Sequence, residues 1–219
     1  MKRHVFLLLL PLCMGPLTAA AQGFKFSDED KAQADAKAER QQRIDTRLST
    51  PCLDRIKNRK IMVLIGEEVN GAVQARQAAF SPHFDAINSR LQKLGLRTTT
   101  LEEIRRQVAQ AEIDAHFRND PDAALSAARR LAANYTLKGL ISSRAMRNPM
   151  IAVNQVAVSL QFVLTGGDGK RVAQAEAQSQ SFSGADVQGM ALTLINEQAD
   201  EVVAKLYSEY CQQPDRRGK

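Results

Sequence analysis

Residues 164–171, LTGGDGKR, are the first candidates for chemistry, because glycines and a lysine at this spacing could form a loop that binds phosphate. Such a loop follows a strand and precedes a helix, so that backbone N–H groups and the helix dipole converge on the anion. Here the flanking segments both alternate apolar and polar residues, which is typical of strands. The Walker spacing is also absent, since Arg171 follows Lys170. Asp168-Gly169 therefore predicts a hairpin turn.

Glu67, Glu68 and Asn70 form a second candidate, because GEEVNG (66–71) follows a predicted strand, where α/β folds place ligands. The two carboxylates could act as an acid/base pair. Adjacent residues on an extended chain point in opposite directions, so a shared substrate would require a bent loop. We expect a solvated interaction loop here, and a small-ligand-binding or hydrolytic site in this loop is the alternative.

The histidines and the search for short catalytic motifs give little further evidence of catalysis or metal binding. His83 falls in the first turn of a predicted helix and His116 late in another, and no partner for either is evident. The motifs HExxH, CxxC and GxSxG are absent. His83 and Asp85 together would leave a metal ion short of ligands. We therefore expect no catalytic residue, no metal and no cofactor.

The N-terminus reads as a secretory signal peptide. Lys2 and Arg3 precede an apolar run from Val5 to Leu12, and small residues lead to a cleavage site after Ala21. The run is too short to span a bilayer, and no second apolar segment of that length follows. Lipidation at Cys13 is the alternative, but a bulky Leu12 occupies the position where a lipoprotein signal needs a small residue. The sequence thus predicts an exported, periplasmic protein without a transmembrane segment.

Cys52 and Cys211 are the cysteines that remain after cleavage. Cys52 precedes the first predicted strand, and Cys211 ends the last predicted helix. An even pair in an exported protein predicts a disulfide. Two buried free thiols or an intermolecular bridge are the alternatives.

Composition argues against nucleic acid as a partner. The net charge of +6 comes from interspersed charges, and aromatic residues make up 5% of the chain, with no Trp. Few side chains could stack on bases, and we expect a solvated surface of mixed charge. The doublets Arg105-Arg106 and Arg129-Arg130 lie opposite apolar helix faces, as solvated charges do.

Residues 22–50 predict a polar spacer. Ser27 and Asp30 could cap a helix, and alanines favour one, but large apolar side chains are nearly absent after Phe26. A solvated helix or a partly disordered spacer is expected.

The remaining chain predicts a regular series of elements. A buried strand at 60–66 precedes a helix from Ser81 to Gly95, a short strand at 96–100, and helices that start at the Thr100/Glu103 capping box and at Asp120-Pro121. A strand at 136–146, two alternating strands around the turn at 166–170 and an apolar-faced helix from about Ala185 complete the series. We predict a single α/β domain with a mixed sheet, in β-α-β-α-β-β-β-α order, with helices packed on the sheet.

This order resembles a recurring envelope domain. The segments that carry the resemblance are RKIMVLIGEEVNG, LQKLGLRTTTLEEIRRQ, ALSAARRLAANYTLKGLISS and the hairpin VAVSLQFVLTGGDGKRVAQAEAQSQ. Similar domains occur in the curli-secretion lipoprotein CsgG, the lipoprotein activator of penicillin-binding protein 1B, the middle domain of flagellar assembly protein T and the N-terminal domain of TolB. The resemblance implies a periplasmic domain that binds other proteins and performs no reaction.

The expected organisation is a signal peptide (1–21), a spacer (22–50), a CsgG/TolB-N-like α/β domain (51–212) and a disordered tail (213–219). The expected function is a non-enzymatic interaction or assembly factor of the bacterial cell envelope. Its partners would be envelope proteins of unspecified identity, and peripheral association with the outer membrane stays open.

Overall fold

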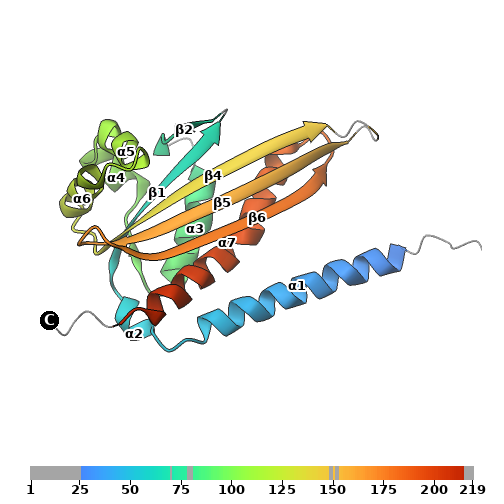
Figure 1. Cartoon of the computed structure of the whole chain (residues 1–219), viewed down its shortest axis with the longest axis horizontal. Helices are drawn as coiled ribbons and strands as arrows, with labels where there is room; N and C mark the ends of the chain where they lie inside the picture. Colours follow the sequence, from blue (N-terminus) through green and yellow to red (C-terminus); the bar gives the residue numbers. More distant parts are fainter. Residues whose placement is uncertain (1–25, 70, 78–80, 148–149, 151–152, 215–219) are drawn as a thin grey trace, which may run out of the picture. The chain divides into compact units, whose positions relative to one another are not determined.

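A computed structural model describes residues 26–69, 71–77, 81–147, 150 and 153–214 (Figure 1). The helices are α1 (Phe26–Leu48), α2 (Leu53–Ile56), α3 (Ser81–Lys93), α4 (Leu101–Gln107), α5 (Gln110–Phe117), α6 (Pro121–Arg130) and α7 (Val187–Gln212). The strands are β1 (Lys60–Val69), β2 (Ala72–Gln74), β3 (Arg97–Thr98), β4 (Tyr135–Arg147), β5 (Asn154–Gly166) and β6 (Arg171–Ser183). The chain divides after Lys37, and the unit that begins at Ala38 contains all of these strands.

The strands form one mixed sheet in the order β2-β1-β4-β5-β6, with β3 paired to β1. β1 runs parallel to β3 and β4, whereas β2, β5 and β6 pair antiparallel with their neighbours. Parallel neighbours need a crossover, which the helices between β1 and β4 provide. The predicted single α/β domain with a mixed sheet and packed helices is confirmed.

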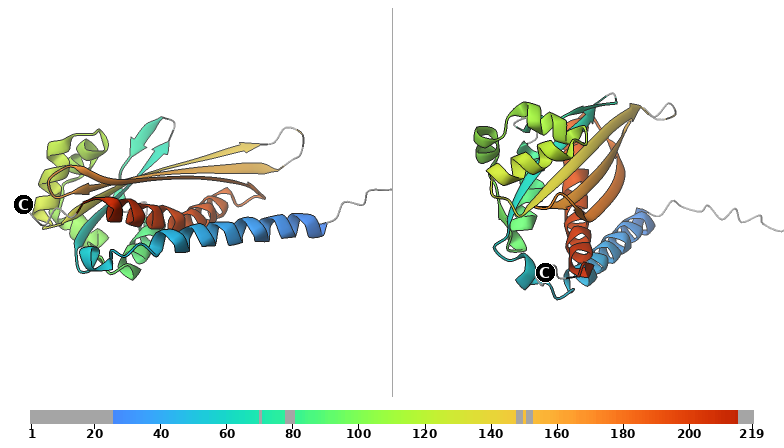
Figure 2. Two further views of the ribbon diagram at one scale, coloured as in Figure 1. Left: turned by 60° about the horizontal axis from the view of Figure 1, so that its bottom comes forward. Right: turned by 60° about the vertical axis from the view of Figure 1, so that its left-hand side comes forward.

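Helices α3 and α7 cover one face of the sheet (Figure 2). The alternating apolar residues of β5 point to this face, and Leu160 and Phe162 have no exposed surface. Phe162 lies over Gly139 of β4, where a Cβ would overlap its ring. Apolar alternation on β5 and helical spacing on α7 thus bury both elements in one core.

Helix α5 packs on the opposite face, where Phe117 contacts Gly66 of β1. Ile104 and Ile113 are buried in α4 and α5, and Leu131 is buried after α6. The far halves of β4, β5 and β6 extend beyond this group of helices (Figure 1). One face of the sheet is therefore covered only in part.

Local signals in the sequence placed several helix ends correctly. Thr100 and Glu103 form the predicted capping box of α4, and Asp120 caps α6 ahead of Pro121. Gly95 follows α3 with a φ of +86°. One predicted helix carrying Ile104 and Val108 is instead two, because the chain turns extended at Val108 before α5 begins. Helix α2 and strand β2 were not predicted.

Residues 166–170 form the predicted turn. The Gly169 N–H donates to the Gly166 carbonyl, and the Gly166 N–H donates to the Lys170 carbonyl. Gly169 has a φ of +77°, which a residue with a side chain rarely adopts. The segment joins β5 to β6 and does not lead into a helix. Its glycines are therefore turn residues and do not form a phosphate-binding loop.

The stretch before the domain is helical in its described part, but it is not purely a spacer. Within the unit that begins at Ala38, Ile44 is only 6% exposed. Arg43 and Arg47 each contact the Glu201 carboxylate of α7 at 3.2 Å. Ile44 is therefore a buried apolar side chain in a stretch for which the sequence predicts a polar spacer. The expected signal peptide (1–21), Cys13 and most of the expected tail lie outside the described residues.

Cys52 and Cys211 are joined by a disulfide in the structure, with Cα atoms 5.6 Å apart across 159 residues of sequence. The Arg55 guanidinium of α2 donates hydrogen bonds to the carbonyls of Cys211 and Gln213 beside it. The end of α7 is thus held against the approach to β1. None of the helices in the described part of the chain has the length and apolar character to cross a bilayer.

Candidate functional site

Glu67 and Glu68 do not lie in a loop, because β1 continues through both of them to Val69. The polar pair suggested that the strand ends at Gly66, but a hairpin with β2 extends it: Glu67 pairs with Gln74, and Glu68 with Val73. Alternation along β1 places the two side chains on opposite faces of the sheet. The two carboxylates therefore do not converge on one substrate. Asn70 lies outside the described residues.

Glu67 lies on the face that carries α3 and α7. The Ser143 hydroxyl of β4 donates to Glu67 Oε1 at 3.4 Å. The pKa of His83 on α3 is lowered by burial, against a smaller raising effect of the Glu67 charge. A serine nucleophile is activated by an adjacent general base, most often an imidazole that accepts its proton. Ser143 has the Glu67 carboxylate, rather than an imidazole, as its hydrogen-bond acceptor.

Glu68 lies on the opposite face, in a shallow hollow over β1, β4, β5 and β6. We call this surface the open face. The registers place Glu68, Ser142, Ser159 and Gln178 in one row across the four strands. Arg144, Ala157 and Gln180 form the next row, towards the end of β4 and the start of β5. The open face therefore presents hydroxyls, amides, one carboxylate and one guanidinium on a rigid sheet.

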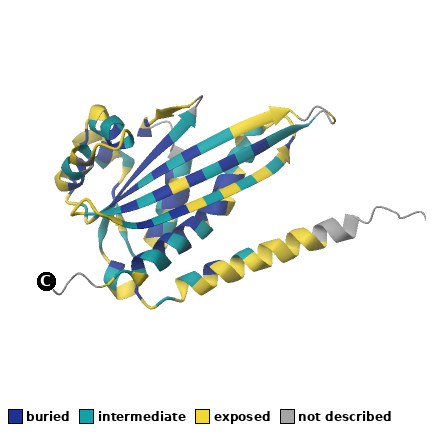
Figure 3. Ribbon diagram, in the orientation of Figure 1, coloured by how far each residue is buried: buried dark blue, intermediate teal, exposed yellow. Residues whose placement is uncertain are grey.

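Only Glu68 of the open face was among the predicted site residues. The signal for the others was present in the sequence, because polar residues alternate with the buried ones along β5 and β6. Alternation reports that a strand has a polar face, but it does not report whether a helix covers that face. The structure supplies this information, since α4, α5 and α6 stop short of the far part of the sheet (Figure 3).

His116 is an interior residue rather than a ligand. Its side chain is 7% exposed, and its Nε2 atom is buried without a hydrogen-bond partner. Burial, with a smaller effect of the Lys138 charge, lowers the pKa of His116 to about 4. Lys138 donates to Asn119 Oδ1 at 2.7 Å, and burial lowers its own pKa. Among the described residues, no group of three or more metal-ligating side chains is present.

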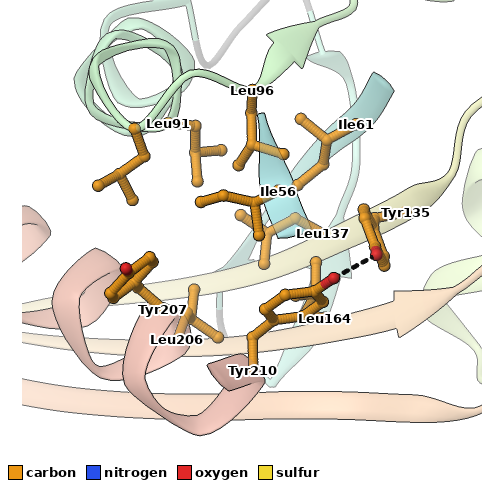
Figure 4. Close-up of a pocket in the computed structure, with 11 residues that line it drawn as sticks. Ile56, Ile61, Leu91, Leu96, Tyr135, Leu137, Leu164, Leu206, Tyr207 and Tyr210 are labelled. Carbon is orange, nitrogen blue, oxygen red and sulfur yellow. Dashed lines mark hydrogen bonds between the residues drawn. The ribbon is translucent and has the colours of Figure 1, made fainter. Parts of the chain in front are cut away.

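The small apolar pocket in Figure 4 is a packing gap. Its volume is about 30 Å³, against several hundred Å³ for small-molecule sites. Aliphatic side chains from α2, α3, β1, β4, β5 and α7 line it, with three tyrosines at its rim. It has room for about one water molecule and offers almost no polar partner. This size and this apolar lining do not fit a polar metabolite.

No family model matches the sequence, and no curated protein matches it. Solved structures with similar backbones include the lipoprotein GNA1162 from Neisseria meningitidis, at 14% identity and a TM-score of 0.47, with 66% of this chain and 98% of that one covered. The hypothetical protein CT253 from Chlamydia trachomatis has 13% identity and a TM-score of 0.49. The match covers 71% of this chain and 99% of CT253. The LpoB C-terminal domain from Salmonella enterica has 15% identity and a TM-score of 0.37. The match covers 60% of this chain and 95% of the LpoB domain.

LpoB, the activator of penicillin-binding protein 1B named among the resemblances, is one of the solved structures found. The resemblances to CsgG, flagellar assembly protein T and TolB stay predictions. At identities below 20% and TM-scores below 0.5, these likenesses assign neither a family nor a function. The function has to be argued from the residues of this chain.

Proposed function

We propose that the protein is a non-enzymatic interaction or assembly factor of the bacterial cell envelope, and that it binds a partner protein through the open face. The observation that carries the proposal is the uncovered surface around Glu68, Ser142, Ser159 and Gln178. Protein interfaces combine such hydrogen-bonding groups with a flat, preformed surface. Ligand sites are enclosed and largely apolar, and the open face is neither.

The alternative, a small-ligand or hydrolytic protein that uses the Glu67–Asn70 segment, has less support. Glu67 and Glu68 are on opposite faces, and the Ser143 hydroxyl donates to a carboxylate. A general acid and a general base must reach the same substrate. The described part of this segment does not meet that condition.

The proposed location is the periplasm, with cleavage after Ala21. The disulfide between Cys52 and Cys211 supports an oxidising compartment, because such bridges are rare in the cytosol. Mass spectrometry of the N-terminus of the periplasmic protein tests the cleavage site.

Partner capture tests the function. The tagged protein is used to recover partners from envelope extract, next to Ser159→Arg on the open face and Lys93→Glu, an exposed charge on α3, as matched control. We expect a stoichiometric partner with the wild-type protein and with Lys93→Glu, and its loss with Ser159→Arg. Thermal stabilisation by a metabolite library, with no partner recovered, would instead favour the small-ligand alternative.

A further inference from the structure

Three large apolar side chains are exposed near the far ends of β4, β5 and β6. Met146 is 56% exposed, Met150 90% and Phe182 57%. Register places Met146 and Phe182 in one row, because both oppose Gln155 of β5. Neighbouring strands are ~4.8 Å apart, so the two side chains are separated by roughly 10 Å on one face. We call Met146, Met150 and Phe182 the apolar tip.

The tip is flanked by cations on both faces of the sheet. Arg144 and Arg147 are exposed at the end of β4, and they are three positions apart, so alternation directs them to opposite faces. The nearest acid after Phe182 along the chain, Asp186, accepts the Gly189 N–H at the start of α7. Guanidinium groups therefore lie on both sides of an apolar end.

The tip also projects from the rest of the fold. In Figure 2 the end of β4 and the start of β5 extend past the first turn of α7, and Figure 3 shows the end of β4 exposed. Exposed apolar surface of this kind marks a contact with a protein or a membrane. A flat protein interface would use cations on one face only, whereas an end that enters a bilayer meets phosphates all around it.

We propose that the apolar tip docks on an anionic lipid surface. Its methionine and phenylalanine side chains enter the boundary between headgroups and acyl chains, while Arg144 and Arg147 bind lipid phosphates at the rim. This inference goes beyond the proposed function, because it assigns a second contact, at the end of the sheet, that does not depend on a protein partner.

Vesicle flotation tests the inference with protein purified from the periplasm, whose N-terminus is verified by mass spectrometry. The probes are vesicles with 30% phosphatidylglycerol in phosphatidylethanolamine and vesicles of phosphatidylcholine alone. We expect binding to the anionic vesicles, and weaker binding to the neutral ones. High salt should reduce the difference, because it screens the phosphates.

Variants locate the contact. Met150→Ser with Phe182→Ser should weaken anionic-vesicle binding by ~tenfold or more, and Arg144→Gln with Arg147→Gln by about fivefold per arginine. Leu53→Ser with Val73→Ser, exposed apolar residues elsewhere, is the matched control and should bind like the wild type. All of these side chains are exposed, and circular dichroism checks that each variant folds.

Failure of the wild-type protein to bind anionic vesicles would overturn the proposal, as would wild-type binding by the tip variants. Equal binding to neutral and anionic vesicles would overturn the role of the arginines. A tip that instead captures a purified envelope protein without lipid would also contradict it. Partner capture through Ser159 is measured without vesicles, so the two proposals can fail separately.

Discussion

The hydroxyl groups of Tyr135 and Tyr210 lie 2.7 Å apart, and their rings meet edge to face with centroids 5.5 Å apart. The pair joins the start of β4 to the last turns of α7. The Arg55 guanidinium of α2 lies over the Tyr210 ring, 5.1 Å from its centroid. This contact therefore ties together three elements next to the disulfide.

Tyr135→Phe should lower the free energy of unfolding by about 1 kcal/mol, because it removes one partly buried hydrogen bond. It should also change the alkaline response. Burial, with the hydrogen bond to Tyr210, raises the pKa of Tyr135. The unfolded chain then loses this proton first, so stability falls as the pH rises above ~10. Urea unfolding at pH 8 and pH 11 should show a smaller alkaline loss in the variant. An identical loss in both proteins would contradict the assignment.

His116→Gln tests how His116 contributes to the loss of stability at acidic pH. The pKa of His116 is about 4 in the folded protein, below the usual histidine value of 6.5. As the pH falls, His116 therefore binds a proton in the unfolded chain before it does so in the folded one. The contribution of neutral His116 is present above pH ~6.5 and is lost between there and pH ~4. The wild type should lose up to about 3 kcal/mol more than the variant across this window, measured by urea unfolding. Parallel pH profiles would show that His116 does not contribute.

Local chemistry explains what the sequence predicted well. The Thr100/Glu103 box, the Asp120 cap and the turn at Gly169 each depend on residues within a few positions of one another. The strict alternation of β5 and β6 likewise reports two faces without reference to the rest of the chain.

Features that depend on distant residues were missed. Glu67 and Glu68 read as a loop, because their pairing with β2 extends a strand through polar residues. Ile44 is one apolar residue in a polar helix, and no local pattern shows that it is buried. The open face exists because the α4–α6 group ends early, which no local pattern encodes.

Ile44→Ala should lower the free energy of unfolding by about 2 kcal/mol, because it leaves a cavity in the contact around α1. Gln42→Ala, an exposed position on the same helix, is the control and should change stability by less than about 0.5 kcal/mol. Thermal unfolding of both variants makes the comparison. Equal melting temperatures for Ile44→Ala and the wild type would restore the expectation of a spacer without packing.

Replacing both Cys52 and Cys211 by Ser should lower stability substantially. Closing a loop of this length contributes up to ~5 kcal/mol in the chain-entropy model, and strain usually reduces that. Protein purified from the periplasm should have a mass two hydrogen atoms below that of the reduced chain, with one linked peptide pair. Two thiols that alkylate freely under native, non-reducing conditions would exclude the bridge.

Site-specific photo-cross-linking in living cells tests the central claim most directly. A benzophenone side chain is placed at Ser159 on the open face, or at Lys93 on the outer surface of α3. The proposed function predicts one defined covalent adduct with an envelope protein from Ser159 and none from Lys93. The absence of any adduct from Ser159, or the same adducts from both positions, would contradict a partner that binds the open face.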